Sequence, residues 1–241
     1  MSINSRSKGK RGELEIAALL RDHGIPARRG VQHQGGPGSP DVKHALDAIV
    51  HFEVKMVSRL ELEDWYDQAS VDSVYRVPVV LHRVSTRKLS TPWRATLSAA
   101  HLAMLYGYEH WAGLEHGDAR QIVEGVANLP VLPHVVQVNA LKFEKEMATA
   151  VSAAASPYGP SPYQPPVLVH ARKDHDALWM ASMDLKEFLA FALLPYAKRV
   201  YGFEPRVVDE YTIEVEREYE AFWQRNRMKL ADNLPLFKAV A

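Results

Sequence analysis

The sequence predicts an α/β protein in which helices pack on a mixed β-sheet. One observation is a helix-period pattern of apolar residues near the start, and another is a run, 48–57, in which apolar and polar residues alternate. The order of the predicted segments up to residue 107 is helix, strand, strand, helix, strand, strand, helix, which is typical of this class. With 241 residues and 47% hydrophobic content, the chain can bury the core that such a fold needs.

The first predicted element is a helix from Glu13 to His23, ended by Gly24. Its apolar residues at helical spacing are Ile16, Leu19 and Leu20. Glu13 shares a face with Ile16 and Leu20, the face that would pack on the sheet, whereas Glu15 does not. A carboxylate on such a face must be paired, bound to a metal or placed at the rim of a cleft, so Glu13 is the better candidate for chemistry.

The next two segments contain three charged residues of interest, Asp41, Glu53 and Lys55. Residues 32–40 (QHQGGPGSP) are rich in Gly and Pro and predict a loop that leads to Asp41, on a neighbouring strand. In the strand 48–57, one face is apolar and the other carries Glu53 and Lys55. The apolar face consists of Val50, Phe52, Val54 and Met56.

The rest of the first half predicts a helix at 60–74, a buried strand at 78–84, a shorter strand at 93–97 and a helix at 98–106. We therefore place a first domain at 1–107 and a connecting segment at 108–133. The remainder, 134–241, is expected to be an α/β extension.

The extension repeats the order of the first half in part. The matching segments are LELE (60–63) with LKFE (141–144), PVVLH (78–82) with PVLVH (166–170), and WRATL (93–97) with WMASM (179–183). Either the chain contains a degenerate internal duplication, or short strand–helix units resemble one another by chance. A Pro-rich loop at 157–166 and a long amphipathic helix at 208–230 complete the extension.

Composition narrows the function. Lys+Arg and Asp+Glu both number 29, so the whole chain is not strongly basic, but residues 1–60 are basic and 204–220 are acidic. A phosphate-binding surface would therefore lie at the N-terminal end, unless the basic residues only form a frayed terminus. Candidate DNA contacts are Lys8, Lys10, Arg11 and Arg29.

The sequence also excludes or disfavours several other classes of protein. The absence of cysteine excludes disulfides, thiolate metal sites and thiol catalysis. No apolar run is long enough for a membrane span and the start lacks a signal-peptide pattern, so we expect a soluble, cytoplasmic protein. A phosphate-cradling loop is not present either, because the glycines of 35–38 lack the spacing and the following helix.

Asp41, Glu53 and Lys55 together suit metal-assisted hydrolysis of a phosphodiester. Such a reaction needs a hard divalent cation held by carboxylate oxygens, together with a positioned and partly deprotonated water. Glu53 and Lys55 project from one face of a strand, and Asp41 can approach from its neighbour. We expect Mg²⁺, with Mn²⁺ as a substitute.

These residues carry a family resemblance. SPD (39–41) followed by FEVK (52–55) resembles the paired motif of PD-(D/E)XK nucleases, and KGKRGE (8–13) resembles the N-terminal helix of archaeal Holliday-junction resolvases and related phage-encoded endonucleases. The resemblance implies a restriction-endonuclease-like fold, with Asp41, Glu53 and Glu13 as metal ligands and Lys55 acting on water. Gln68, on the following helix, would face the site.

The resemblance implies DNA as the partner, branched or duplex. Two sites acting on opposite strands would require a homodimer, which two copies of this chain could form. In the extension, VQVN (136–139) stands where a repeat would place the Glu-x-Lys strand, and Gln and Asn cannot replace its charges. If the duplication is real, this half is catalytically inactive and would serve packing, dimer mimicry or DNA placement. The alternative is a nuclease-derived DNA-binding or assembly protein with weak or no cleavage. His33, His44 and His51 are interpreted as ordinary histidines.

Overall fold

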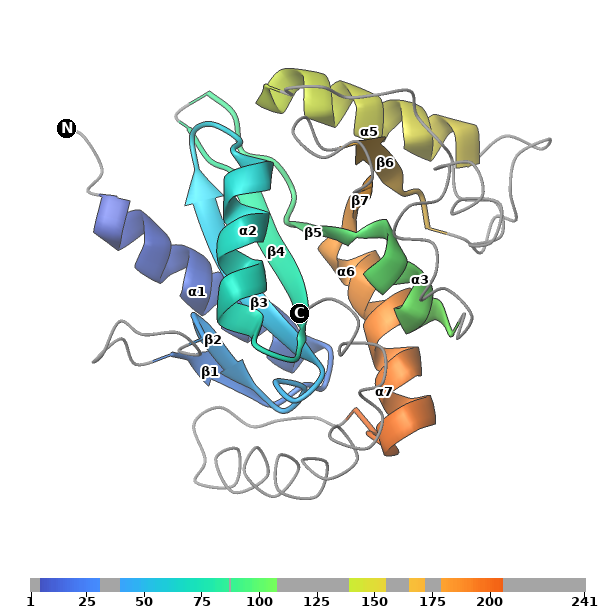
Figure 1. Cartoon of the computed structure of the whole chain (residues 1–241). Helices are drawn as coiled ribbons and strands as arrows, with labels where there is room; N and C mark the ends of the chain where they lie inside the picture. Colours follow the sequence, from blue (N-terminus) through green and yellow to red (C-terminus); the bar gives the residue numbers. More distant parts are fainter. Residues whose placement is uncertain are drawn as a thin grey trace. The chain divides into compact units, whose positions relative to one another are not determined.

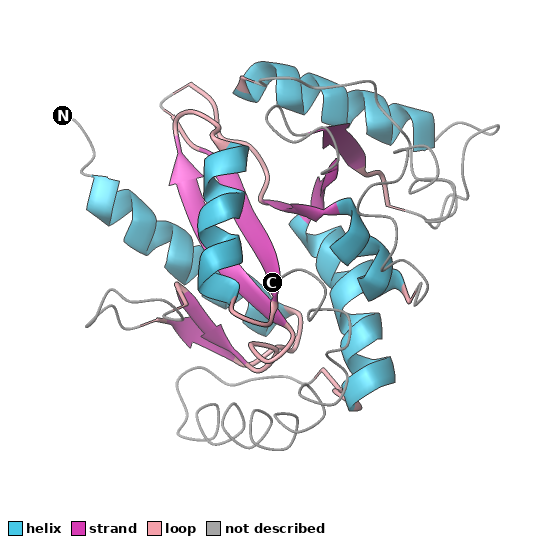
Figure 2. Ribbon diagram, in the orientation of Figure 1, coloured by secondary structure: helices cyan, strands magenta, loops and turns pink. Residues whose placement is uncertain are grey.

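The computed structural model describes residues 5–30, 40–86, 88–107, 139–154, 165–171 and 179–205 (Figure 1). These residues form both helices and strands, as Figure 2 shows. In order the elements are α1 (Ser5–Asp22), β1 (Ala27–Arg29), β2 (Val42–His44), β3 (Val50–Val57), α2 (Leu62–Ser73), β4 (Val77–Val84), β5 (Arg94–Ser98), α3 (Ala99–Tyr106), α5 (Ala140–Ala154), β6 (Leu168–Ala171), β7 (Trp179–Asp184), α6 (Leu185–Glu187), the π-helix η2 (Phe188–Leu193) and α7 (Leu194–Tyr201).

The strands form a five-stranded sheet in the order β3-β4-β5-β7-β6 and a separate two-stranded sheet of β1 and β2. Val77 N donates to Ile49 O (2.9 Å) and Ser85 N donates to Val57 O (2.8 Å), and these bonds advance together along both strands. The β3–β4 pair is therefore parallel, whereas β7 is antiparallel to both β5 and β6. The predicted α/β class with a mixed sheet is confirmed.

Two compact units divide the chain, and neither is continuous in sequence. Unit 1 contains Met1–Met56, Asp64–Val80 and Ala197–Ala241, and unit 2 contains Val57–Glu63 and Leu81–Tyr196. Strand β4 belongs to both units. The domain boundaries expected from the sequence, with a first domain ending at residue 107, stay a prediction.

Unit 1 contains the elements that the first sixty residues predicted. The α1 face formed by Ile16, Ala17 and Leu20 is buried, and the β3 side chains Val50 and Phe52 are fully buried. The predicted apolar face of this strand is thus buried, but its polar face is largely buried too, because His51 and Glu53 are only 1% and 6% exposed. The burial of these side chains is the main favourable contribution to the folding of this unit.

The prediction of where α1 begins was wrong, because the helix begins at Ser5 instead of Glu13. The basic residues Lys8, Lys10 and Arg11 are good helix formers, and they extend the helix toward the N-terminus despite Gly9 and the buried Gly12. The basic residues are thus arranged on helical turns.

Strand β1 was not predicted, and β2 is not in the same sheet as β3. The register pairs Ala27 with His44 and Arg29 with Val42. A strand of three residues has no usable period, so only its partner across the loop defines it. Asp41 precedes β2 and approaches β3 from this two-stranded sheet.

Gly30 closes the base of this two-stranded sheet. Its N–H donates to Asp41 O (2.8 Å), and a Cβ added to Gly30 would lie 2.1 Å from Pro40 O. Both atoms belong to backbone, so a side chain here would force the Pro40–Asp41 segment to move.

We expect Gly30→Ala to lower the free energy of unfolding by about 1–3 kcal/mol, because overpacking against backbone strains the fold. Chemical denaturation would measure the change. Gly9→Ala is the matched control, since the nearest atom to its Cβ, Glu13 Oε1, lies 4.0 Å away and alanine favours a helix. Equal stability of Gly30→Ala and the wild type would contradict the prediction.

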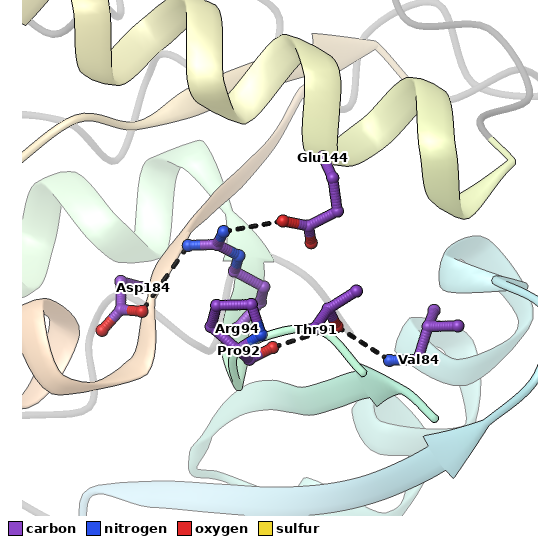
Figure 3. A network of polar contacts seen from close by, with 6 residues as sticks. All are labelled: Val84, Thr91, Pro92, Arg94, Glu144 and Asp184. Atoms are coloured by element: carbon purple, nitrogen blue, oxygen red, sulfur yellow. Dashed lines mark hydrogen bonds and ion pairs between the residues drawn. The ribbon is translucent and has the colours of Figure 1, made fainter. Parts of the chain in front are cut away.

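Unit 2 is built on β5, β7 and the helices that follow them. Ser98 caps α3 by accepting from His101 N (3.1 Å), and Gly107 ends the helix with a left-handed conformation (φ 96°). Figure 3 shows Arg94 of β5 between Glu144 of α5 (2.9 Å) and Asp184 of β7 (3.5 Å). This arginine ties three elements of the unit together.

Several predictions fall on residues outside the described ones. They are the connecting segment 108–133, most of the Pro-rich loop 157–166, residues 136–138 and the amphipathic helix 208–230. Within the described residues, no helix has the length and apolar character that crossing a bilayer requires.

Candidate active site

The polar face of β3 carries a charged pair that a helix residue extends. Lys55 Nζ lies 2.6 Å from Glu53 Oε1, and it donates to Gln68 Oε1 of α2 over 2.9 Å. Glu53 and Lys55 are neighbours because alternate strand residues share a face. α2 runs alongside β3 (Figure 1), with Trp65 and Ala69 buried and Gln68 exposed. The structure thus brings Lys55, Glu53 and Gln68 into contact.

Asp41, whose carbonyl oxygen accepts from Gly30 N, contacts β3 through its side chain. Its Oδ2 accepts from Val54 N over 2.9 Å, which places the carboxylate beside the backbone between Glu53 and Lys55. Burial, followed by the nearby Asp41 charge, raises the pKa of Glu53 to about 7, although the Lys55 ammonium opposes this shift. The two carboxylates therefore repel each other, and a cation between them would relieve the repulsion.

Glu13 is buried, as its place on the core-facing stripe predicted, with only 6% of its surface exposed. Its Oε2 accepts from Arg29 Nε in a close ion pair. Burial raises the pKa of Glu13, the Arg29 hydrogen bond lowers it, and the Asp41 charge raises it. Arg29, a predicted DNA contact, is thus engaged with a predicted metal ligand.

The carboxylates do not all meet at one point. Among the described residues, the one group of three whose ligand atoms all lie within 4.8 Å of one another consists of His51, Glu53 and Asp72, and this cluster could bind a metal ion. Glu13, Asp41 and Glu53 do not form a group of that tightness. Asp41 is nonetheless close enough to raise the pKa of both glutamates.

The remaining basic candidates lie along α1. Lys10 is exposed and Lys8 is half-buried. Arg11 forms an ion pair with Glu15 (3.6 Å), and its guanidinium also approaches Met56 Sδ (3.3 Å). These three residues stay predicted DNA contacts.

Sequence reasoning missed His51 and Asp72. The sequence indicates an ordinary histidine at position 51, although His51 shares the polar face of β3 with Glu53 and Lys55. Asp72 follows Gln68 by one helical turn, so both lie on the same side of α2. These two spacings were the available signal, but the register of the helix on the strand was not in the sequence.

The chain matches no protein-family model, and neither the curated proteins nor the solved structures include a significant match.

Proposed function

We propose that this chain is a metal-dependent endonuclease that hydrolyses DNA phosphodiester bonds, with a restriction-endonuclease-like core of the PD-(D/E)XK type and Mg²⁺ as cofactor. The observation that carries the proposal is the arrangement of Asp41, Glu53 and Lys55. Two carboxylates and an ammonium group meet at one stretch of β3, at the rim of a buried core.

The donor set fits a hard cation, because Asp41 and Glu53 offer carboxylate oxygens and repel each other without one. When bound, Mg²⁺ would neutralise the phosphate and lower the pKa of a water molecule. Lys55 would orient that water or, as a neutral amine, take up its proton, and Gln68 would hold the Lys55 amino group in place. Glu13 would complete the cation site from α1.

The basic residues of α1 support DNA as the substrate. Lys8 and Lys10 lie on the helix that also carries Glu13, so phosphates held there would be close to the candidate site. Whether the preferred substrate is a four-way junction or a linear duplex then depends on how the DNA backbone binds next to β3.

Cleavage assays with purified protein test the proposal. A four-way junction, a linear duplex and single-stranded DNA would each be incubated with Mg²⁺, Mn²⁺ or EDTA. We expect cutting with either cation and none with EDTA, and an Asp41→Asn preparation made in parallel excludes a contaminating nuclease. Absence of cutting under every metal condition would refute the proposal.

One observation favours a second function, that of a DNA-binding or assembly protein with weak or no cleavage. Arg29 forms an ion pair with Glu13, so this carboxylate already has a cationic partner. Salt-sensitive DNA binding without metal-dependent cutting in the same assays would support this second function.

Cation affinity should depend on pH through Glu53. Its folded pKa of about 7 lies above the ordinary value of 4.5, so the carboxyl is largely protonated at pH 6 and largely ionised at pH 8. Because ligation requires the ionised form, we expect the dissociation constant for Mg²⁺ to fall about ten-fold from pH 6 to pH 8. Isothermal titration across this range measures it, and Glu53→Gln should show weak binding with little of this dependence.

A further inference from the structure

The buried histidine His51 of β3 lies near the carboxylates of Glu53, on the same strand, and Asp72, on α2. His51 is only 1% exposed, and neither of its ring nitrogens has a hydrogen-bond partner among the described residues. A buried polar group without a partner is costly, and each such group calls for an explanation, such as a bound metal ion.

The geometry around His51 supplies that explanation. A ring nitrogen of His51 and carboxylate oxygens of Glu53 and Asp72 all lie within 4.8 Å of one another. Ligands about 2.1 Å from a common ion are roughly 3 to 4.3 Å apart, so small side-chain movements would complete the coordination. A neutral imidazole nitrogen is a common ligand of transition metals.

We propose that His51, Glu53 and Asp72 form a second cation site, which shares Glu53 with the Mg²⁺ position and takes a first-row transition metal such as Mn²⁺. The imidazole nitrogen distinguishes this site from an all-oxygen one, because nitrogen ligands favour transition metals over Mg²⁺. The site stands on its own ligands and does not depend on DNA cleavage.

Mn²⁺ binding to the full chain tests the site, with isothermal titration, electron paramagnetic resonance of free Mn²⁺ and the metal-induced rise in Tm as readouts. We expect His51→Gln and Asp72→Asn each to lower the affinity for one bound Mn²⁺ by at least about ten-fold. Asp64→Asn, an exposed change on the same helix, and His44→Gln, a buried histidine stacked on Phe52, are the matched controls.

Asp72 is half-buried, so Asp72→Asn should fold even if His51→Gln does not. Unchanged Mn²⁺ affinity in Asp72→Asn, or no Mn²⁺ binding by the wild type, would overturn this site. Loss of cleavage in Asp41→Asn with this Mn²⁺ retained would support it and separate it from the nuclease proposal.

An independent observation in unit 2 concerns the pairing of β5 with β7. The sequence match of residues 93–97 with 179–183 makes Thr96 equivalent to Ser182, and the register places these two residues opposite each other. Ala95 lies opposite Met183, and Leu97 lies opposite Ala181. A two-fold axis through the Thr96–Ser182 pair would therefore exchange equivalent residues along both strands.

The ends of the two strands obey the same symmetry. Ser98 and Asp184, equivalent in the match, have similar extended backbones (φ −65°, ψ 146° and φ −60°, ψ 139°). Each is the N-cap of the helix that follows, accepting from His101 N and Lys186 N respectively. Both strands thus pass into a helix through a capping side chain at the same position.

Buried hydrogen bonds connect the side chains of His82, Thr96 and Ser182. The hydroxyls of Thr96 and Ser182 share a hydrogen bond (2.7 Å), and His82 Nε2 lies 2.8 Å from Thr96 Oγ1. His82 matches His170 in the sequence repeat, and the two histidines lie on β4 and β6, which flank the central strands. The sheet order β4-β5-β7-β6 is accordingly symmetric in its elements.

We infer that the two strand-strand-helix segments are copies of one unit, paired within the chain as two subunits would pair in a dimer. Strand β7 occupies the edge of β5 through which a second copy would otherwise bind. Asn139 is the residue that corresponds to Lys55 in the sequence repeat. It caps α5, because its side chain accepts from Lys142 N (2.9 Å). If the proposed function holds, the chain is a monomer with one catalytic set, and it cuts one DNA strand in each binding event.

Light scattering and plasmid cleavage test this inference together. We expect a molar mass near 27.1 kDa and conversion of supercoiled plasmid to the nicked circle before any linear product. A dimer in solution, or linear product formed directly by the monomer, would overturn it. A monomer that cuts no DNA would refute the proposed function while supporting the internal pairing.

Discussion

Replacing Lys55 by methionine is expected to lower the rate of metal-dependent DNA cleavage by about 10²–10⁴-fold, the usual contribution of a positioned acid–base group. Methionine keeps an unbranched stem on β3 but removes the ammonium that lies 2.6 Å from Glu53 and 2.9 Å from Gln68. Single-turnover cleavage at saturating protein would measure the chemical step without the contribution of DNA binding.

The same substitution should shift the pH dependence of any remaining activity. The Lys55 charge lowers the pKa of Glu53, so its removal raises that pKa and moves the activity profile to higher pH. Lys142→Met, an exposed change on α5, is the matched control and should cleave as the wild type does. A Lys55→Met rate within a few-fold of the wild type at pH 7 and at pH 8.5 would contradict the assigned role.

Replacing Arg76 by alanine is expected to lower the free energy of unfolding by about 3–5 kcal/mol, the cost of removing one partner from a buried ion pair. Arg76 Nη1 lies 2.7 Å from Asp47 Oδ1, and the two side chains are only 11% and 5% exposed. Arg76 also donates to Ser73 O (2.9 Å) and Asp72 O (3.1 Å), so it fastens the end of α2.

Chemical denaturation with a double-mutant cycle would test this. The double variant Asp47→Leu/Arg76→Met should be less destabilised than the sum of its two single variants, because neither charge is then buried alone. Arg59→Ala, an exposed arginine, is the control and should change stability little. A loss below about 1 kcal/mol in Arg76→Ala would show that the pair contributes little.

Local periodicity predicted much of unit 1. The alternation of β3 identified its apolar face, although both faces are largely buried, and the helical spacing of Ile16 and Leu20 placed Glu13 on the buried side of α1. It also placed Glu53 and Lys55 together, because the two-residue repeat of a strand is a property of the backbone. These predictions required no knowledge of any distant contact.

Other features of the site depend on residues far apart in the sequence. β1 is defined by its pairing with β2, and Glu13 was not expected to pair with Arg29. The approach of Asp72 to His51 depends on how α2 lies against β3. No periodic pattern encodes such contacts, so the sequence did not reveal them.

The sequence by itself determined the α/β class, the strand that carries Glu53 and Lys55, and the buried face on which Glu13 lies. Only the tertiary structure decided which of these groups meet, that His51 and Asp72 join Glu53, and that Thr96 lies opposite Ser182. The physical reason is that secondary structure follows from local backbone geometry and burial, whereas register and side-chain convergence depend on packing across the whole unit.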